Sequence, residues 1–228
     1  MSSLHDPEFG EVALRRSRLA RAVRLKLDAR GVISLSLPMR APVFIARQLL
    51  DESRDHVRQL LAGIQAKRRP YHHGDLIGKT HTLRFEPAGE YGHRLEQNAL
   101  IISHPLATQP QKLNQTITDG ISKALRMQAR SYLPRRLQQL AEITGFTYQK
   151  VRFSSAGTRW GSCSSQGTIS LNIWLMQLPF ELIDYVLIHE LCHTRQMNHS
   201  TAFWSLVERY CSDYRTRRRQ LRGHHPHA

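Results

Sequence analysis

The chain has 228 residues, a formal net charge of +15 and three cysteines. None of its apolar runs approaches the ~18 residues of a membrane span, and its start lacks the basic and then apolar pattern of a secretory signal. Three cysteines without close pairing argue against a disulfide framework, so we expect a cytoplasmic protein. The positive charge favours contact with polyanions such as nucleic acid or nucleotides, although it can also simply solvate the surface.

The first part of the chain is rich in predicted strands. Residues 1–14 show no apolar period and are expected to form a loose terminus. Apolar residues alternate with polar ones in 22–28 and again in 32–37, which predicts a hairpin with its turn at Ala29-Arg30-Gly31.

A helix and further strands follow this hairpin. Apolar residues at helical spacing predict one helix over 43–67, ended by Pro70. Strands are predicted over 78–85 and 99–103, with a loop between them. We therefore expect an N-terminal mixed α/β lobe over residues 15–110.

The second lobe is expected over residues 111–222, with a frayed tail at 223–228. It begins with a predicted helix over 111–143, in which Pro134 predicts a kink or a break and after which Gly145 caps the end. Strands are predicted over 148–154 and 168–173, and the Ser- and Gly-rich residues between them are expected to form a loop.

The clearest chemical signal is the motif His189-Glu190-Leu191-Cys192-His193 at the end of a predicted helix that starts near Pro179. Residues four apart lie on one face of a helix, so His189 and His193 can bind the same zinc ion. Glu190 lies beside the first ligand and can act on a water molecule there without binding the metal. The alternative is a pair of exposed or packed histidines without a metal.

His199 is the candidate third ligand, because a turn just after the helix would return it to the first two. Ser200 can then cap a second helix. Metzincins have glycine midway between the second and third histidines; this chain has Gln196 there, so we expect Asn198 to make the turn in a left-handed conformation. Three protein ligands leave an open position, which is typical of a catalytic zinc.

These residues resemble a known family. The segments Arg159-Trp160-Gly161-Ser162-Cys163, Gly167-Thr168-Ile169-Ser170-Leu171-Asn172, the HExxH motif and Asn198-His199-Ser200 are together similar to the YgjP-like metal-dependent hydrolases, which are zincin-type proteins akin to SprT-like and WLM peptidases. The resemblance implies an α+β fold, with a strand-rich N-terminal lobe and a minimal zincin-like lobe that has an active-site helix and an edge strand for extended substrate. It implies His189, His193 and His199 as ligands of Zn2+ and Glu190 as general base.

Three functions remain open at this point. A metallopeptidase is the first, because a helix with an edge strand suits a peptide. Hydrolysis of a nucleoside triphosphate such as UTP, an activity attributed to part of the family, is the second, although no phosphate-binding glycine loop is evident. The third is a nucleic-acid-associated protein whose structural zinc would need a fourth protein ligand.

Other candidate residues depend on these alternatives. Candidate substrate-binding residues are Arg159, Trp160, Ser170, Asn172 and Tyr185. Arg159 can bind an anionic group or pair with Asp184, Trp160 can also simply pack, and Tyr185 is one candidate oxyanion donor. Cys192 is expected in the core, and Cys163 could reach the metal from its loop.

Overall fold

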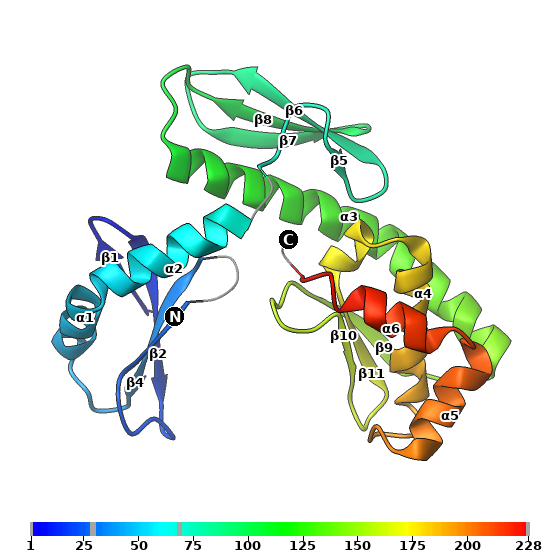
Figure 1. The fold of residues 1–228 in the computed structure, drawn as a ribbon. Helices are drawn as coiled ribbons and strands as arrows, with labels where there is room; N and C mark the ends of the chain where they lie inside the picture. The colour runs from blue at the N-terminus through cyan, green and yellow to red at the C-terminus, as the bar shows by residue number, and fades with distance from the viewer. Residues whose placement is uncertain (1, 28–30, 68–69, 227–228) are drawn as a thin grey trace. The chain divides into compact units, whose positions relative to one another are not determined.

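The chain forms two units in the computed structural model, which describes residues 2–27, 31–67 and 70–226 (Figure 1). The first unit ends at Arg69 and the second comprises Pro70–Pro226. Hydropathy patterns predicted the division near residue 110 instead. It falls earlier because the strands of residues 76–104 share a hydrophobic core with the long helix that follows them. Residues 29 and 30 of the predicted turn, and the basic residues 68 and 69, lie outside the described part.

The first unit is a four-stranded sheet with two helices. The strand order is β1-β2-β4-β3, with β2 and β4 parallel and the other pairs antiparallel. The strands are β1 Ser2–Asp6, β2 Gly10–Ser17, β3 Arg24–Leu27 and β4 Ile33–Pro38. The predicted antiparallel pairing of β3 with β4 is confirmed.

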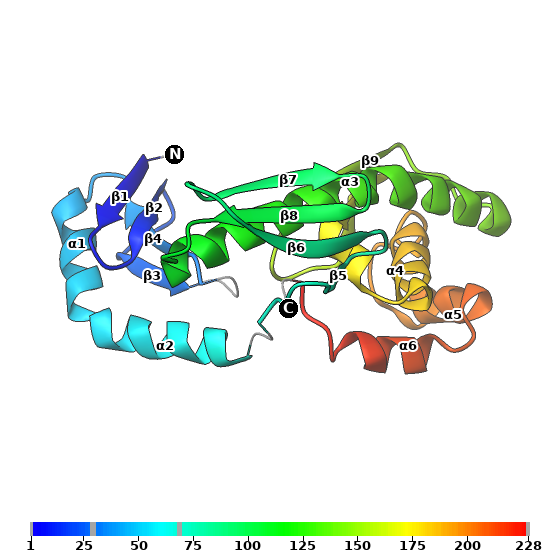
Figure 2. The same ribbon diagram turned by 90° about the horizontal axis from the view of Figure 1, so that it is seen from above.

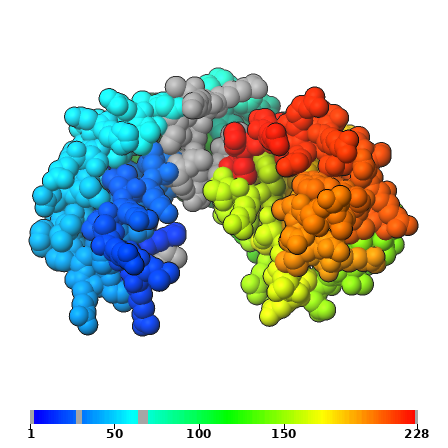
Figure 3. Space-filling view, turned by 60° about the horizontal axis from the view of Figure 1, so that its bottom comes forward, coloured from blue at the N-terminus to red at the C-terminus, as the bar shows by residue number. Residues whose placement is uncertain are grey.

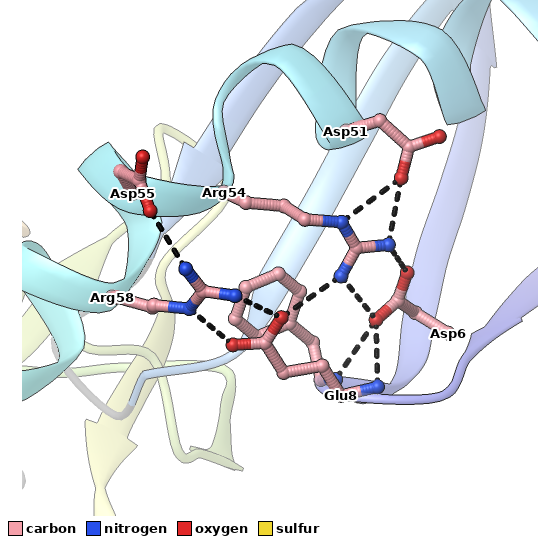
Figure 4. Close-up of polar contacts among 7 residues, drawn as sticks. Asp6, Glu8, Asp51, Arg54, Asp55 and Arg58 are labelled. Atoms are coloured by element: carbon pink, nitrogen blue, oxygen red, sulfur yellow. Dashed lines mark hydrogen bonds and ion pairs between the residues drawn. The ribbon is translucent and has the colours of Figure 1, made fainter.

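The expectation of a loose N-terminus is wrong. Residues 2–17 form the β1–β2 hairpin, since Leu4, Val12 and Leu14 are buried in the core of this unit. At its turn the buried Asp6 accepts hydrogen bonds from two backbone amides and from the Arg54 guanidinium (Nη2–Oδ2 2.7 Å; Figure 4). This contact ties the hairpin to the helical part of the same unit.

The helix predicted over 43–67 is divided at Ser53 into α1 Val43–Glu52 and α2 Arg54–Lys67. Side chains from both helices meet the β1–β2 turn in one ion network. Arg54 contacts Asp6, Glu8 and Asp51, and Arg58 contacts Glu8 (Figure 4). The break therefore places Arg54 where it can bind three carboxylates.

The second unit is organised around α3 Pro110–Thr144. A four-stranded sheet in the order β5-β6-β8-β7 lies against the first half of this helix (Figures 1 and 2). Its strands are β5 Leu76–Ile77, β6 His81–Pro87, β7 Gly92–Glu96 and β8 Ala99–His104. Strand β7 occupies part of the segment predicted as a loop.

Helix α3 continues through Pro134 without the predicted break and ends at Gly145, whose φ of +68° confirms it as the cap. Buried residues run along the helix from Ile117 to Thr144, so packing on its sides stabilises it across the proline. Beyond Pro134, Arg136 forms a bidentate ion pair with Asp184 of α4 (2.8 and 2.7 Å). The predicted alternative pairing of Arg159 with Asp184 is therefore wrong.

The second half of α3 adjoins a three-stranded sheet in the order β10-β11-β9. Its strands are β9 Lys150–Ser154, β10 Gly161–Cys163 and β11 Thr168–Asn172. Strand β10 lies within the segment predicted as a loop. It is an edge strand, whereas β11 is central and pairs parallel with β9 and antiparallel with β10.

The remaining elements are helical. They are the 3-10 helix η1 Ile173–Gln177, α4 Phe180–Cys192, α5 Thr201–Tyr210 and α6 Tyr214–Leu221. The predicted cap of α5 is confirmed, since the Ser200 side chain accepts a hydrogen bond from the Phe203 amide. With three small sheets and six α-helices among the described residues, the α+β class is confirmed. None of the described helices combines the length and the apolar character that a membrane span requires.

Candidate metal centre

Helix α4 carries the candidate site into the core of the second unit. It starts after Pro179, with Glu181 in its first turn at the positive end of the helix dipole. Most of its side chains are buried, and it contacts α3, α5, α6 and β10. His189 lies in the last turn of this helix and His193 is the residue at its C-terminal cap.

The three predicted ligands are brought together. One nitrogen from each of His189, His193 and His199 can be chosen so that all three lie within 4.8 Å of one another. Nε2 of His189 lies 3.1 Å from Nε2 of His199. Imidazole nitrogens this close can share one ion, because zinc–nitrogen bonds are about 2.0–2.1 Å long and their tetrahedral arrangement spaces the nitrogens by roughly 3.3 Å.

The backbone fixes the orientation of His193. Its Nδ1 lies 2.9 Å from the carbonyl oxygen of Gln196, so this nitrogen donates its proton there and Nε2 keeps its lone pair for a metal. The chain leaves the helix through amides that donate back to the carbonyls of Leu191 and Cys192. The expectation of a left-handed Asn198 is wrong. Among the described non-glycine residues, a positive φ occurs at Gln97 and not at Asn198.

Aromatic rings of α5 pack against all three histidines and are stacked on two of them. The Phe203 ring is stacked on His193, with centroids 4.4 Å apart and planes inclined by 26°. The Trp204 ring is stacked on His199, with centroids 5.6 Å apart and an angle of 23°. Because Ser200 starts α5 directly after His199, the cap fixes the position of both rings relative to the ligands.

Glu190 is buried beside β10 and is only 5% exposed. A Cβ atom added at Gly161 would lie 2.6 Å from Oε1 of Glu190 and 2.8 Å from its Cγ, so the carboxyl group packs on the backbone of β10. Its Oε2 atom is buried and has no hydrogen-bond partner within the described residues. Burial raises the pKa of Glu190 to about 8, and the charge of Arg159 partly opposes this shift.

Desolvation and neighbouring charges keep His189 and His193 neutral. Burial is the main cause that lowers the pKa of His189 to about 3, with further contributions from His193, His199 and Arg218. Burial also lowers the pKa of His193. Metal ligands must be deprotonated before they bind, so these shifts favour a cation at this position over bound protons.

A cleft of about 890 Å3 opens beside the histidines. Trp160 and Tyr185 line it together with His189 and His199. The ring of Tyr185 lies 6.0 Å from that of His189, and burial raises the pKa of Tyr185 to about 12, so its hydroxyl stays protonated at neutral pH.

The other predicted substrate residues lie elsewhere. Arg159 is exposed and adjoins the cleft residue Trp160 in sequence; in the part of the chain described its side chain forms no hydrogen bond or ion pair, although its charge acts on Glu190. Asn172 is fully buried, and its amide donates to the carbonyls of Ala156 and Arg159, which holds the loop before β10. Ser170 lies on β11, whose backbone is paired on both sides.

Neither Cys163 nor Cys192 belongs to the cluster of possible metal ligands. Cys192 is fully buried in the core as expected. Cys163 lies on β10, and burial raises the pKa of its thiol to about 11, away from the thiolate form. Within the described residues the cluster has three members, so the fourth ligand that a structural zinc would need does not occur there.

Sequence patterns missed two groups of residues, one beside Glu190 and one at the cleft. Gly161, under Glu190, was noted only as part of a motif. Arg218, Arg222 and His224 line the cleft from α6 and the segment after it. Helix α6 was not predicted because it shows no apolar period. Tyr214 is its one buried residue, and most of its other residues are arginine. The spacing of four between Arg218 and Arg222 is the signal that could have placed them on one helix face.

A helix that carries two histidines and a buried glutamate, with a third histidine close by and a cleft beside the group, is typical of metal-dependent hydrolases. The YgjP-like metallopeptidase domain matches residues 21–224. The chain therefore belongs to the YgjP-like family and is a metal-dependent hydrolase of the metallopeptidase class. Membership implies a divalent metal ion, and the three-histidine group is compatible with one.

Two solved structures are similar to part of the chain. The metallopeptidase zymogen abylysin of Pyrococcus abyssi is 26% identical, with a TM-score of 0.36, over 40% of this chain and 92% of that one. The metallopeptidase zymogen jannalysin of Methanocaldococcus jannaschii is 18% identical, with a TM-score of 0.33, over 38% and 93%. No curated protein matches the sequence.

Proposed function

We propose that this protein is a zinc metallopeptidase in which His189, His193 and His199 hold the metal and Glu190 is the general base. The observation that carries the proposal is the convergence of three imidazoles, two of them with depressed pKa values, beside a buried carboxyl group with an unpartnered oxygen. An unpaired buried polar atom is costly unless a ligand or water satisfies it. A water molecule at the metal would satisfy Oε2 of Glu190.

Zinc, when bound, would act as a Lewis acid that polarises the carbonyl group and lowers the pKa of a neighbouring water. Glu190 takes the proton from the attacking water and delivers it to the amine that leaves. The hydrogen bond from Nδ1 of His193 to the Gln196 carbonyl oxygen leaves Nε2 of His193 unprotonated, so that it would be free to bind the metal. Tyr185, protonated and beside His189, can donate a hydrogen bond to the oxygen that becomes negative.

Peptide is the substrate that suits the surroundings of these groups. Strand β10 is an edge of its sheet, contacts α4 and begins directly after Trp160 of the cleft. The unpaired backbone of an edge strand can bind an extended peptide by adding it as a further strand. Such a peptide would pass Glu190, which packs on Gly161 of the same strand.

The test compares Glu190→Gln with the wild-type protein, both loaded with zinc. We expect the variant to bind zinc with unchanged stoichiometry and to lose hydrolysis of casein-derived peptides. Glu181→Gln is the matched control, since Glu181 is an exposed residue in the first turn of the same helix and should leave turnover unchanged. Full peptidase activity of Glu190→Gln would refute the base assignment. Turnover of UTP without turnover of any peptide would refute the choice of substrate.

A further inference from the structure

The cleft beside the histidines has one strongly basic wall. Arg218, Arg222, His224 and His225 line it from α6 and the following segment, and no aspartate or glutamate is among its described lining residues. In Figure 3 this red segment lies directly beside the yellow-green residues that precede β10. A substrate in the cleft therefore meets positive charge on this side.

The position of Arg218 is fixed relative to the candidate ligands. Its guanidinium lies over the ring of Trp204, 4.5 Å from the centroid, and the same ring is stacked on His199. Tyr214 stacks on Trp204 as well, with centroids 5.4 Å apart. A cation held by an aromatic ring in this way keeps its charge at one place while its N–H groups remain available.

These charges have no ion-pair partner within the described part of the chain. On the same helix Arg217 pairs with Asp213 (2.8 Å), and Arg215 lies 3.7 Å from Glu208. Arg218 and Arg222 have no such carboxylate among the described residues, although like charges four residues apart destabilise a helix. An anion in the cleft would offset this repulsion.

We propose that Arg218 and Arg222 select peptides with an acidic side chain close to the bond that is cleaved. The proposal rests on the peptidase function above and adds its substrate class. A carboxylate is the expected anion, because the substrate of the proposed peptidase is a peptide, whose acidic side chains carry that group. The guanidinium group of arginine matches a carboxylate in geometry and can bind it through paired N–H groups.

The test uses zinc-loaded full-length protein and three fluorogenic peptides that differ only in having Glu, Gln or Lys next to the cleaved bond. The wild-type protein should favour Glu over Gln by about fivefold in kcat/KM, as expected for exposed ion pairs. Salt at 0.5 M should reduce this preference. In Arg222→Glu the order should reverse, with Lys preferred over Glu. Arg219→Glu is the control, because Arg219 carries the same charge on the same helix but does not line the cleft; the preference should persist there.

The outcomes separate the two proposals. Equal cleavage of the three peptides by the wild-type protein, with Glu190→Gln inactive, would overturn the selection of acidic peptides and leave the peptidase function standing. Equal loss of preference in Arg219→Glu and Arg222→Glu would also overturn it, since the general field would then be responsible. Failure of the zinc-loaded wild-type protein to cleave any peptide would overturn the peptidase function and this inference with it.

Discussion

The contact between Gly161 and Glu190 makes the most specific prediction about catalysis. In Gly161→Ala the new Cβ would lie 2.8 Å from Cγ of Glu190 and 2.6 Å from Oε1. Carbon atoms in good contact are about 3.5–4.0 Å apart, so Cγ and the carboxyl group behind it must move by roughly 0.7 Å or more. Glu190 is almost fully buried and cannot turn into solvent to avoid the methyl group.

A displacement of this size should reduce kcat on the cleaved peptide by roughly tenfold to a hundredfold, since a misplacement of about 1 Å can cost a factor of about 10². Overpacking should also lower the free energy of unfolding by about 1–3 kcal/mol. Zinc affinity should stay close to that of the wild-type protein, because the three atoms nearest to the added methyl group all belong to Glu190.

The assay measures kcat, KM, zinc content and thermal unfolding for Gly161→Ala beside Gly89→Ala. An alanine Cβ at Gly89 meets no atom within 4 Å, so this control should behave like the wild-type protein. If Gly161→Ala keeps full kcat with normal stability, then the position of the Glu190 carboxyl group does not limit the reaction and the reasoning fails.

Three further predictions concern stability and metal affinity. In the metal-free protein the pKa of Glu190 rises from 4.5 to about 8 on folding, so the native state binds a proton that the unfolded state lacks and stability falls as pH rises through this window. Denaturant titrations of the metal-free proteins should show that the free energy of unfolding of Glu190→Gln rises relative to that of the wild-type protein by roughly 3–5 kcal/mol between pH 4.5 and pH 8. A difference between the two proteins that does not vary with pH would refute this. Trp204→Ala should weaken zinc binding about tenfold in competition with a chelator, because the ring orients His199; unchanged affinity would show that the stacking does not contribute. Arg136→Ala should lower the free energy of unfolding by about 1–3 kcal/mol, since the partly buried Asp184 loses a bidentate partner; an unchanged denaturation midpoint would contradict this.

The features that the sequence predicted are those set by local chemistry. The helix that starts after Pro179, the Ser200 cap and the glycine at position 145 each depend on a few neighbouring residues, and the structure has all three as expected. The approach of His199 to His189 also follows from a short connection, although the turn is made by backbone hydrogen bonds and not by Asn198.

The features that were missed depend on partners far along the chain. Strand β10 has three residues in a Ser- and Gly-rich segment, and pairing with β11 makes it a strand. The N-terminal hairpin likewise gains its order from a core shared with β4 and from Arg54, which is distant in sequence. The boundary between the units could not be read from hydropathy because the β5–β8 sheet and α3 share one core.

The chemistry of the cleft lay beyond local patterns for the same reason. Gly161 matters through its contact with Glu190 of another element, and no periodicity signals such a contact. Arg218 gains its place from the ring of Trp204, a residue of the preceding helix. Charge composition indicated an affinity for anions, but only the fold places two arginines in the cleft.

X-ray absorption at the zinc edge of the fully loaded protein tests the metal centre most directly. Three imidazole nitrogens and one further oxygen or nitrogen should appear at about 2.0–2.1 Å, without sulfur. His199→Ala should lose one imidazole contribution, since His199 is one of the three proposed ligands. A sulfur atom at about 2.3 Å, as Cys163 would give, or four protein ligands that close the site to water, would contradict the catalytic centre described above.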